Sequence, residues 1–502
     1  MNDLAIPYSS DELFDLYRSK DEAFWREIGE RRTLALFARA AREVPAYADF
    51  LKKHGIDPSR IRTWADFQQV PVTDKANYLR QYPLEDLSWG GTLLGKPLDF
   101  AATSGSTGTP FYFPRSEQLE WQCSTILEMF LRHSSFQSRG PVAVINAFAM
   151  GPWMGGMMTY KAFDLVNQRG KHPVSILCAS NNKPAIFEAL RHWAIHFPEV
   201  VVCGYPPLIK DVVDEGAREG IDWRRFHLRF HFAAEAFSED FRQYVAKAAC
   251  LRNSWLDTLS IYGSADLGAM AFETPWAILM RELITENASL SESLFTGKTA
   301  TLAQFNPFFV QFEAPGGTVL VSGNNTIPLI RYSLGDIGGV LEFSELTRAL
   351  DRQGVAWKGH IQEAGLESYR YELPFVYVHE RSDFAVSLCG AKIFPETIRK
   401  ILIQEGFQRF CTGKFTLLVS HDEKQNPHLE VHVECKRGGT AAEKQELDLQ
   451  QAIVAALLRE NAEYRSAYEQ MREKALPKLV FWPFEHSLHF GPHAKHKWIK
   501  HA

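Results

Sequence analysis

Apolar residues follow helix-like and strand-like spacings in turn from about residue 115 onward. Helical spacing is seen at 116–132, where Ser116 can cap the helix, and again at 185–197. Short apolar runs typical of strands lie at 200–206 and 228–235. Such alternation predicts an α/β fold with a mainly parallel sheet, whose ligands lie at the carboxyl ends of the strands.

The last third of the chain predicts a second, smaller domain. A helical segment at 395–404 is followed by a hairpin around the polar turn DEKQNP, between 415 and 435. A long, charged helical stretch at 441–474 comes next, either continuous or broken. We therefore expect a large N-terminal domain at 1–381 and a small, mobile α+β C-terminal domain at 382–502.

Composition narrows the class of protein. The chain has 502 residues, 45% hydrophobic and 23% charged, as is usual for a globular protein and unlike a disordered or fibrous one. A net charge of −5 gives no reason to expect a nucleic-acid partner. Scattered cysteines without a C-x-x-C pair, and a first segment unlike a signal peptide, favour a cytoplasmic location.

One uncharged stretch, 140–160, is long enough to cross a membrane. Because it holds four glycines and two prolines, we instead expect a buried strand followed by a glycine-rich loop, and no membrane partner.

A Ser/Thr/Gly loop, TSGSTGTP, occupies 103–110. Its glycines let the backbone approach a ligand closely, and its hydroxyl and N–H groups can donate to phosphate oxygens. The loop lacks the lysine of a Walker-type site, and an ordinary surface loop is the alternative.

Two further motifs combine an aspartate with two glycines. In YGSADLG, Asp266 follows a predicted strand and could hold Mg²⁺ through oxygen. In RYSLGDIG, Asp336 could accept hydrogen bonds from two ribose hydroxyls. Each motif is also compatible with a simple turn.

The order and spacing of these motifs resemble the adenylate-forming superfamily of acyl- and aryl-CoA synthetases, and most closely its phenylacetate–CoA ligase branch. VPVTDKANYLRQYP is similar to the N-terminal segment of that branch, and TSGSTGTP to its phosphate loop. AAEAFSEDFR resembles the adenine-flanking segment, and YGSADLG and RYSLGDIG the two nucleotide motifs. ERSDFAVSLCGAKIFPETI resembles the hinge motif.

The resemblance implies a two-step reaction. A small-molecule carboxylic acid attacks the α-phosphorus of ATP, giving acyl-AMP and pyrophosphate, and CoA then displaces AMP. Two anions meet in the first step and repel by about 4 kcal/mol at an intermediate dielectric, which Mg²⁺, N–H groups and a lysine must offset. An amine or a carrier-protein thiol is an alternative acceptor, and a degenerate nucleotide-binding scaffold is a second alternative. A homodimer is a further expectation.

The resemblance also implies roles for individual residues. Tyr262, with Gly263 and Ser264, would lie near adenine and the α-phosphate, Asp336 would bind the ribose and Asp266 would bind Mg²⁺. The remaining roles are Thr103, Ser104, Gly105, Ser106, Thr107 and Gly108 for the β- and γ-phosphates, Ala233 and Glu235 beside adenine, Arg381 on the nucleotide, and Asp383 as the hinge.

The chain departs from the family pattern at three places. Thr109 replaces a lysine that is frequent in the phosphate loop, and Asp266 is one methylene shorter than the usual glutamate. In the tail HFGPHAKHKWIKHA we expect Lys495 to be the catalytic lysine, with Lys497 as the second choice. The alternative is a solvated basic tail.

The acid itself should bind beside the uncharged stretch. Aromatic residues make up 13% of the chain, which permits an aryl or other small organic acid. The predicted pocket residues are Phe148, Trp153, Met154, Met158 and Tyr205. The alternative is that these side chains are ordinary core residues.

Overall fold

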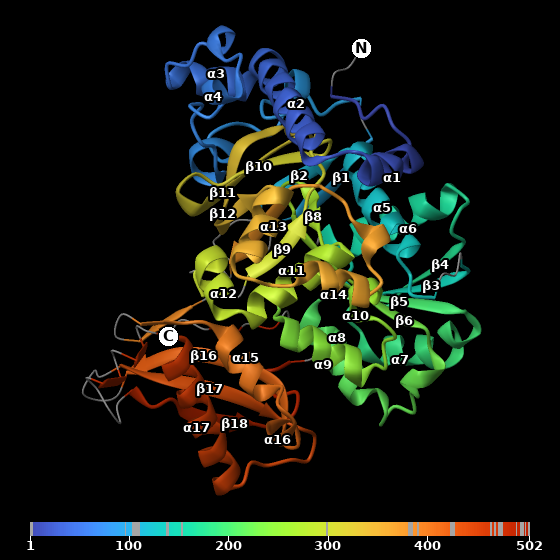
Figure 1. Ribbon diagram of the computed structural model, residues 1–502, viewed down its shortest axis with the longest axis vertical. Coiled ribbons are helices and arrows are strands. Elements are labelled where there is room, and N and C mark those ends of the chain that lie inside the picture. The colour runs from blue at the N-terminus through green and yellow to red at the C-terminus, as the bar shows by residue number, and fades with distance from the viewer. Residues whose placement is uncertain are drawn as a thin grey trace. The chain divides into compact units, whose positions relative to one another are not determined.

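The structure, a computed structural model, has two compact units. Figure 1 labels their helices and strands. The first unit contains Met1–Glu235, Ala249–Thr296 and Ala300–His379, and the second contains Ala236–Ala248, Gly297–Thr299 and Glu380–Ala502. The structure describes residues 4–95, 97–102, 111–136, 140–151, 154–297, 300–379, 385–388, 391–421, 427–461, 464–465, 468–469, 475–487, 489–491, 496 and 498–499.

One eleven-stranded sheet organises the first unit. From one edge to the other its strands are β10 (Val310–Glu313), β11 (Thr318–Gly323), β12 (Leu329–Leu341), β13 (Phe375–His379), β9 (Ala300–Gln304), β8 (Gly268–Phe272), β7 (Thr258–Ser264), β6 (Leu228–Ala233), β5 (Glu199–Gly204), β3 (Val142–Asn146) and β4 (Val174–Cys178).

The sheet is mixed, so the expectation of a mainly parallel sheet is wrong for half of it. Pairing is parallel from β4 through β3, β5 and β6 to β7, and antiparallel from β7 through to β10. Helical crossovers connect the parallel strands, whereas β7 and β8 are joined by a short turn that permits only antiparallel pairing. The predicted α/β class is nevertheless confirmed.

Helices cover the parallel half of the sheet (Figure 1). They are α5 (Glu117–Arg132), α6 (Met154–Gln168), α7 (Lys183–His192) and α8 (Pro206–Gly216). Helix α8 begins at a proline, which is tolerated there because the first N–H of a helix has no intrahelical acceptor.

Helix α6 begins inside the stretch expected to be a glycine-rich loop. Gly155 and Gly156 lie in its first turn. A Cβ atom at Gly156 would lie 2.5 Å from the carbonyl oxygen of Ala149, so the glycine lets the start of the helix pack against the preceding loop.

The N-terminal helices are α1 (Ser10–Ser19), α2 (Glu22–Glu43), α3 (Pro45–Lys53) and α4 (Trp64–Phe67). The segment after them attaches to β12: the Thr73 N–H donates to the Arg331 carbonyl oxygen, and the Thr73 hydroxyl donates to that of Ile330 at 2.8 Å. The N-terminal segment is thereby fixed beside the RYSLGDIG motif.

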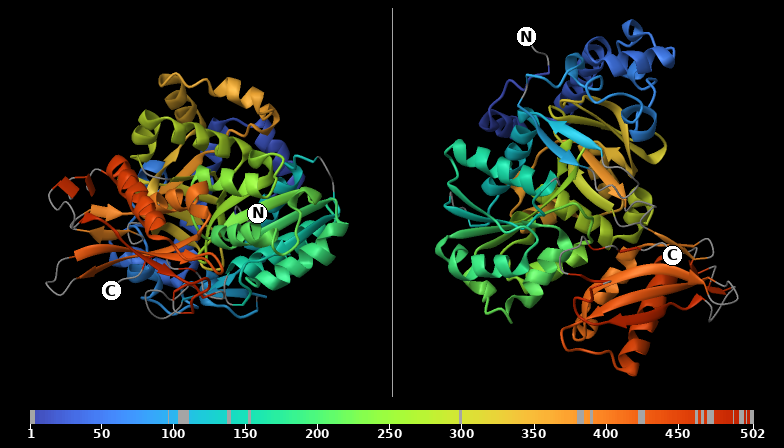
Figure 2. Two further views of the ribbon diagram at one scale, coloured as in Figure 1. Left: turned by 90° about the horizontal axis from the view of Figure 1, so that it is seen from below. Right: turned by 180° about the vertical axis from the view of Figure 1, so that it is seen from behind.

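The other helices of the first unit are α10 (Ser254–Asp257), α11 (Pro275–Glu286), α12 (Ala288–Phe295), α13 (Phe343–Arg352) and α14 (Trp357–Glu363). A separate two-stranded ribbon, β1 (Asp99–Ala102) with β2 (Tyr112–Arg115), is visible in light blue in the right view of Figure 2. Among the described residues, no helix is both long and apolar enough to cross a membrane.

The second unit has its own core. The predicted hairpin is confirmed as β16 (Cys411–His421) and β17 (Pro427–Cys435), and β18 (Lys478–Trp482) joins β17 in parallel. Its further elements are α9 (Glu239–Ala248), β14 (Val386–Leu388), β15 (Ala391–Ile393), α15 (Pro395–Leu402), α16 (Glu405–Gln408) and α17 (Glu443–Glu460).

The charged helical stretch is broken, which the pattern left open: α17 ends at Glu460, and residues 464–465 and 468–469 are helical again. Asn461 adopts extended backbone at the break, and its side chain accepts a hydrogen bond from the Tyr464 N–H at 2.9 Å.

Candidate active site

The two aspartate motifs meet through crossed tyrosine–aspartate pairs. Tyr262 of YGSADLG donates its phenol proton to Asp336 Oδ2 of RYSLGDIG at 2.5 Å. Tyr332 of RYSLGDIG donates to Asp266 Oδ1 of YGSADLG at 2.6 Å. The first bond joins residues that lie 74 positions apart in the sequence, and the second joins residues that lie 66 positions apart. The two motifs are therefore connected twice. Charge-assisted hydrogen bonds of this length hold both carboxylates in one orientation.

The Asp266 carboxylate is buried and has a cation beside it. Only 3% of its side chain is exposed, and Lys75 Nζ lies 3.5 Å from Oδ1. Burial, followed by the charge of Asp266, raises the pKa of Tyr332 far above its usual range, so this phenol remains a donor.

Lys75 is not among the site residues predicted from the sequence, although it lies in the segment VPVTDKANYLRQYP. Lys75 begins a single turn of π-helix, Lys75–Leu79, whose first N–H groups donate to the Asp74 carboxylate. Its ammonium lies 6.0 Å from the centre of the Phe113 ring on β2. The sequence signal for this turn was Asp74, which precedes Lys75 and can cap a helical turn. The proximity of the Lys75 ammonium to Asp266 depends on the tertiary structure.

The described residues do not form a magnesium site by themselves. Mg²⁺ requires near-octahedral oxygen coordination. In the described part of the chain, no group of three or more His, Cys, Asp or Glu side chains is placed to hold a metal ion. The Asp266 carboxylate is already bonded by Tyr332 and paired with Lys75, which does not suit a metal ligand. Its role in binding Mg²⁺ stays a prediction.

Glycines shape the turn that carries Asp266. A Cβ atom at Gly263 would lie 2.7 Å from the Gly268 carbonyl oxygen, and Gly268 has φ +71°, which favours glycine. Within the turn, the Leu267 N–H donates to the Ser264 hydroxyl at 3.3 Å. The turn between β7 and β8 thus depends on both glycines of the motif.

The predicted phosphate loop connects β1 to β2, where Ala102 pairs with Tyr112. This pairing brings the two ends of the loop together. The loop itself, and several other predicted site residues, lie outside the described residues: Thr103, Ser104, Gly105, Ser106, Thr107, Gly108, Trp153, Arg381, Asp383, Lys495 and Lys497.

The predicted adenine-flanking segment follows β6 directly. Ala233 ends the strand, and Ala233 and Glu235 are both partly buried. Between them, Ala234 has φ +75°, a conformation that costs a non-glycine residue on the order of 1 kcal/mol. Contacts with the surrounding structure must therefore stabilise this left-handed backbone conformation at Ala234.

Four of the five predicted pocket residues belong to the main hydrophobic core of the first unit or pack against it. Phe148 and Met158 are buried within it, and Met154 and Tyr205 are partly buried against it. Tyr262 of the nucleotide motif packs against the same cluster. The predicted acyl-binding side chains and Tyr262 are thus part of the main core of the first unit.

The C-terminal tail is attached to the small unit on both sides of Lys497. His496 Nε2 lies 2.7 Å from the Phe415 carbonyl oxygen, and the Leu417 N–H donates to the Trp498 carbonyl oxygen at 2.7 Å. The Arg399 guanidinium lies 4.3 Å from the centre of the Trp498 ring. The described tail residues therefore pack on β16 and α15.

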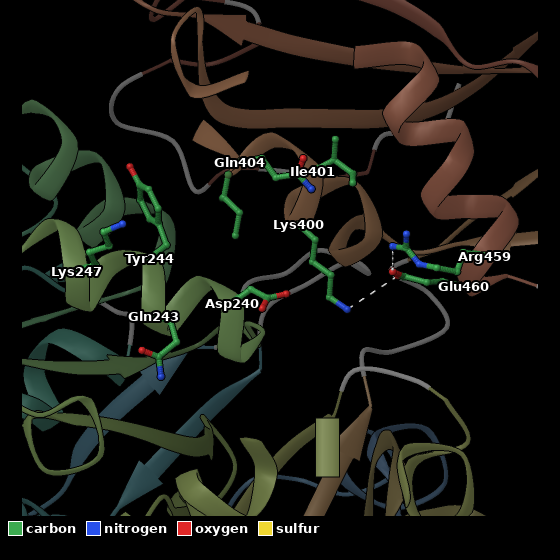
Figure 3. Close-up of a pocket in the computed structure, with 10 residues that line it drawn as sticks. Asp240, Gln243, Tyr244, Lys247, Lys400, Ile401, Gln404, Arg459 and Glu460 are labelled. Atoms are coloured by element: carbon green, nitrogen blue, oxygen red, sulfur yellow. Dashed lines mark hydrogen bonds and ion pairs between the residues drawn. The ribbon is translucent and has the colours of Figure 1, made fainter. Parts of the chain in front are cut away.

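A pocket of about 510 Å³ lies within the second unit (Figure 3). In Figure 3, Lys400 points toward Glu460, with Nζ 4.0 Å from Oε2, and Arg459 pairs with the same carboxylate. None of the predicted site residues lines this pocket, so it is not assigned to the nucleotide. Its lining residues are Asp240, Gln243, Tyr244, Lys247, Lys400, Ile401, Ile403, Gln404, Arg459 and Glu460.

Comparisons with known proteins bear on the fold. No protein-family model matches the chain, and no curated protein matches it in sequence. Among solved structures, it is similar to 2-hydroxyisobutyryl-CoA ligase in the postadenylation state, with a TM-score of 0.68 and 14% identity over 97% of this chain and 92% of that one.

The same ligase with its acyl-AMP and CoA, in the thioesterification state, gives a TM-score of 0.55 at 14% identity over 97% of this chain and 91% of that one. GH3.15 acyl acid amido synthetase gives 0.58 at 13% identity over 95% of this chain and 88% of that one. The chain therefore has the fold of these ligase and amido synthetase structures.

Proposed function

We propose that this protein activates a carboxylic acid with ATP to give acyl-AMP and pyrophosphate, and then transfers the acyl group to CoA. The crossed hydrogen bonds of Tyr262 with Asp336 and of Tyr332 with Asp266 carry this proposal. They join the two motifs that the resemblance assigns to the nucleotide, as a shared binding site requires.

Asp336 is the proposed ribose ligand. Its carboxylate is half-buried and oriented by the Tyr262 phenol, and a carboxylate has further lone pairs for two ribose hydroxyls. A Cβ atom at Gly268 would lie 2.7 Å from Met158 Cε, so this predicted pocket residue lies beside the YGSADLG motif, which supports placing the acid close to the nucleotide. An aryl or other small organic acid is the proposed substrate class.

In the first half-reaction, a carboxylate oxygen of the acid bonds to the α-phosphorus while the bond to the bridging oxygen breaks and pyrophosphate leaves. The loop 103–110 would bind the β- and γ-phosphates, and Lys495 would stabilise charge at the α-phosphate. In the second half-reaction, the deprotonated CoA thiol attacks the acyl carbonyl and AMP leaves.

We also propose that the small domain rotates to a different orientation between the two half-reactions. Asp383 would be the hinge, between domains at 1–381 and 382–502. The change from one compact unit to the other after His379 supports a boundary close to this residue.

An amine is the second candidate acceptor. The similarity to an acyl acid amido synthetase, at a TM-score of 0.58, favours it. Incubating preformed acyl-AMP with the protein and either CoA or a panel of amines separates the two by the product, a thioester or an amide.

The first half-reaction is tested by exchange of labelled pyrophosphate into ATP, across a panel of carboxylic acids and without any acceptor. We expect acid-dependent exchange that Asp336→Ala reduces and that Asp15→Ala, at an exposed carboxylate, leaves unchanged. ATP binding without exchange for any acid would instead support a degenerate nucleotide-binding scaffold, a reading that the engagement of Asp266 by Lys75 favours.

A further inference from the structure

His231 is a buried imidazole without a polar partner among the described residues. It lies on β6, is 2% exposed, and neither ring nitrogen has a hydrogen-bond partner in the described part of the chain. Burial lowers the pKa of His231 to about 3, so the ring is neutral at ordinary pH. A neutral imidazole has one donor and one acceptor, and leaving both unpaired in an interior costs stability.

A second buried histidine of the same unit shows the usual arrangement. His133 is 5% exposed, and burial, followed by the charge of Arg229, lowers its pKa to about 3. Its Nε2, however, lies 2.7 Å from the Tyr371 hydroxyl. Because the described residues pair one buried imidazole and leave the other unpaired, His231 needs an explanation other than burial alone.

The surroundings of His231 point to the acyl pocket. The Phe148 ring, predicted to line that pocket, meets the His231 ring nearly edge to face, with centroids 5.4 Å apart and an interplanar angle of 72°. In the sheet, Cys203 of β5 and Leu259 of β7 pair with His231 in register. His231 also lies two residues before Ala233, which is predicted to flank adenine.

We infer that His231 binds a hydroxyl group on the acid, so that the substrate is a hydroxycarboxylic acid; this rests on the proposed function. A hydroxyl is the group of choice because it donates and accepts, as a neutral imidazole does. A second carboxylate on the acid is disfavoured, because the apolar neighbours and the uncharged ring offer no compensating positive charge.

The test is acid-dependent pyrophosphate exchange with matched acids that share a carbon skeleton and differ by one hydroxyl. We expect the full-length protein to use the hydroxy acid with at least about tenfold higher kcat/KM, since a site built for a hydroxyl rejects its apolar analogue. His231→Phe should lose at least about tenfold on the hydroxy acid and little on the apolar acid. His231→Gln, which keeps a donor and an acceptor, should recover part of the preference.

His133→Phe is the matched control. It should lower the melting temperature, because it removes the buried hydrogen bond between the imidazole and the Tyr371 hydroxyl, and should leave the acid preference unchanged. His231→Phe should not lower the melting temperature of the free protein. Equal losses on both acids, or a fall in melting temperature as large as that of His133→Phe, would show that His231 is structural.

The outcomes also separate the inference from the proposed function. Exchange without a preference for hydroxy acids rejects only the role of His231. No exchange by the unmodified protein with any acid rejects the proposed function and this inference with it.

Discussion

The two ends of the crossed tyrosine–aspartate arrangement differ in exposure and charge. At one end, Asp336 is half-buried and bonded by Tyr262. At the other, Asp266 is 3% exposed, bonded by Tyr332 and paired with Lys75. The same chemical pair is thus found once where a ligand could reach the carboxylate and once where neighbouring side chains surround it.

This difference in exposure indicates that the two aspartates have different roles. A carboxylate that is partly accessible and already oriented can accept hydrogen bonds from a ligand at little reorganisation cost. A buried carboxylate with both a hydrogen-bond donor and a cation has its charge compensated inside the protein. We therefore expect Asp336 to affect ATP binding and Asp266 to affect stability.

The largest expected effect on activity comes from a residue outside the two tyrosine–aspartate pairs. If the crossed pairs only position the nucleotide, a cation elsewhere must stabilise charge at the α-phosphate. Lys495→Ala should lower the adenylation rate at least about a hundredfold, roughly 2.7 kcal/mol, while ATP affinity falls less. Rapid-quench measurement of acyl-AMP formation tests this.

Lys497→Ala is the control for the tail, because His496 between the two lysines packs on β16. Thioester formation from preformed acyl-AMP should survive Lys495→Ala. If Lys497→Ala alone shows the rate loss, the assignment is wrong by two positions.

Asp336→Ala should give the next largest effect. Loss of a charged acceptor for ribose hydroxyls should weaken ATP binding by about 1.5–3 kcal/mol. Isothermal titration calorimetry with ATP measures it. Unchanged ATP affinity would remove Asp336 from the site and end the contrast with Asp266.

Asp266→Ala should act on stability instead. It leaves the buried Tyr332 hydroxyl unpaired and removes the partner of Lys75, so we expect the free energy of unfolding to fall by about 2 kcal/mol. Urea denaturation compares it with Asp336→Ala, which should cost less. Equal losses in the two variants would show that exposure does not distinguish the two ends.

Lys75→Ala should give the smallest change. The lysine side chain is 41% exposed, so its ion pair with Asp266 should stabilise the fold by less than about 1 kcal/mol. Urea denaturation at low and high salt measures it, with Lys53→Ala as an exposed control on an i,i+4 pair. A loss as large as that of Asp266→Ala would make the ion pair, and not the Tyr332 hydrogen bond, the main support of Asp266.

Local sequence patterns were sufficient for several elements. Hydrophobic spacing predicted α5, β5, β6, α8 and α15, and the polar turn between two alternating runs predicted the hairpin of β16 and β17. Such patterns succeed because a helix repeats every 3.6 residues and a strand every two, so the buried face is visible in the sequence. They fail where glycine spacing suggests a loop but tertiary packing allows a helix, as at the start of α6.

The amino-acid sequence by itself determined the α/β class, the separate α+β segment and the ordered motifs that indicate adenylation. Only the tertiary structure decided the antiparallel half of the sheet, the crossing of the tyrosine–aspartate pairs, the placement of Lys75 beside Asp266 and the unpaired state of His231. Periodicity records which face of an element is buried, but contacts between residues 66 or 74 positions apart depend on the path of the chain between them. The apolar run LRFHFA shows that a histidine is buried, whereas its hydrogen-bond partners depend on which side chains the neighbouring strands and loops bring to it.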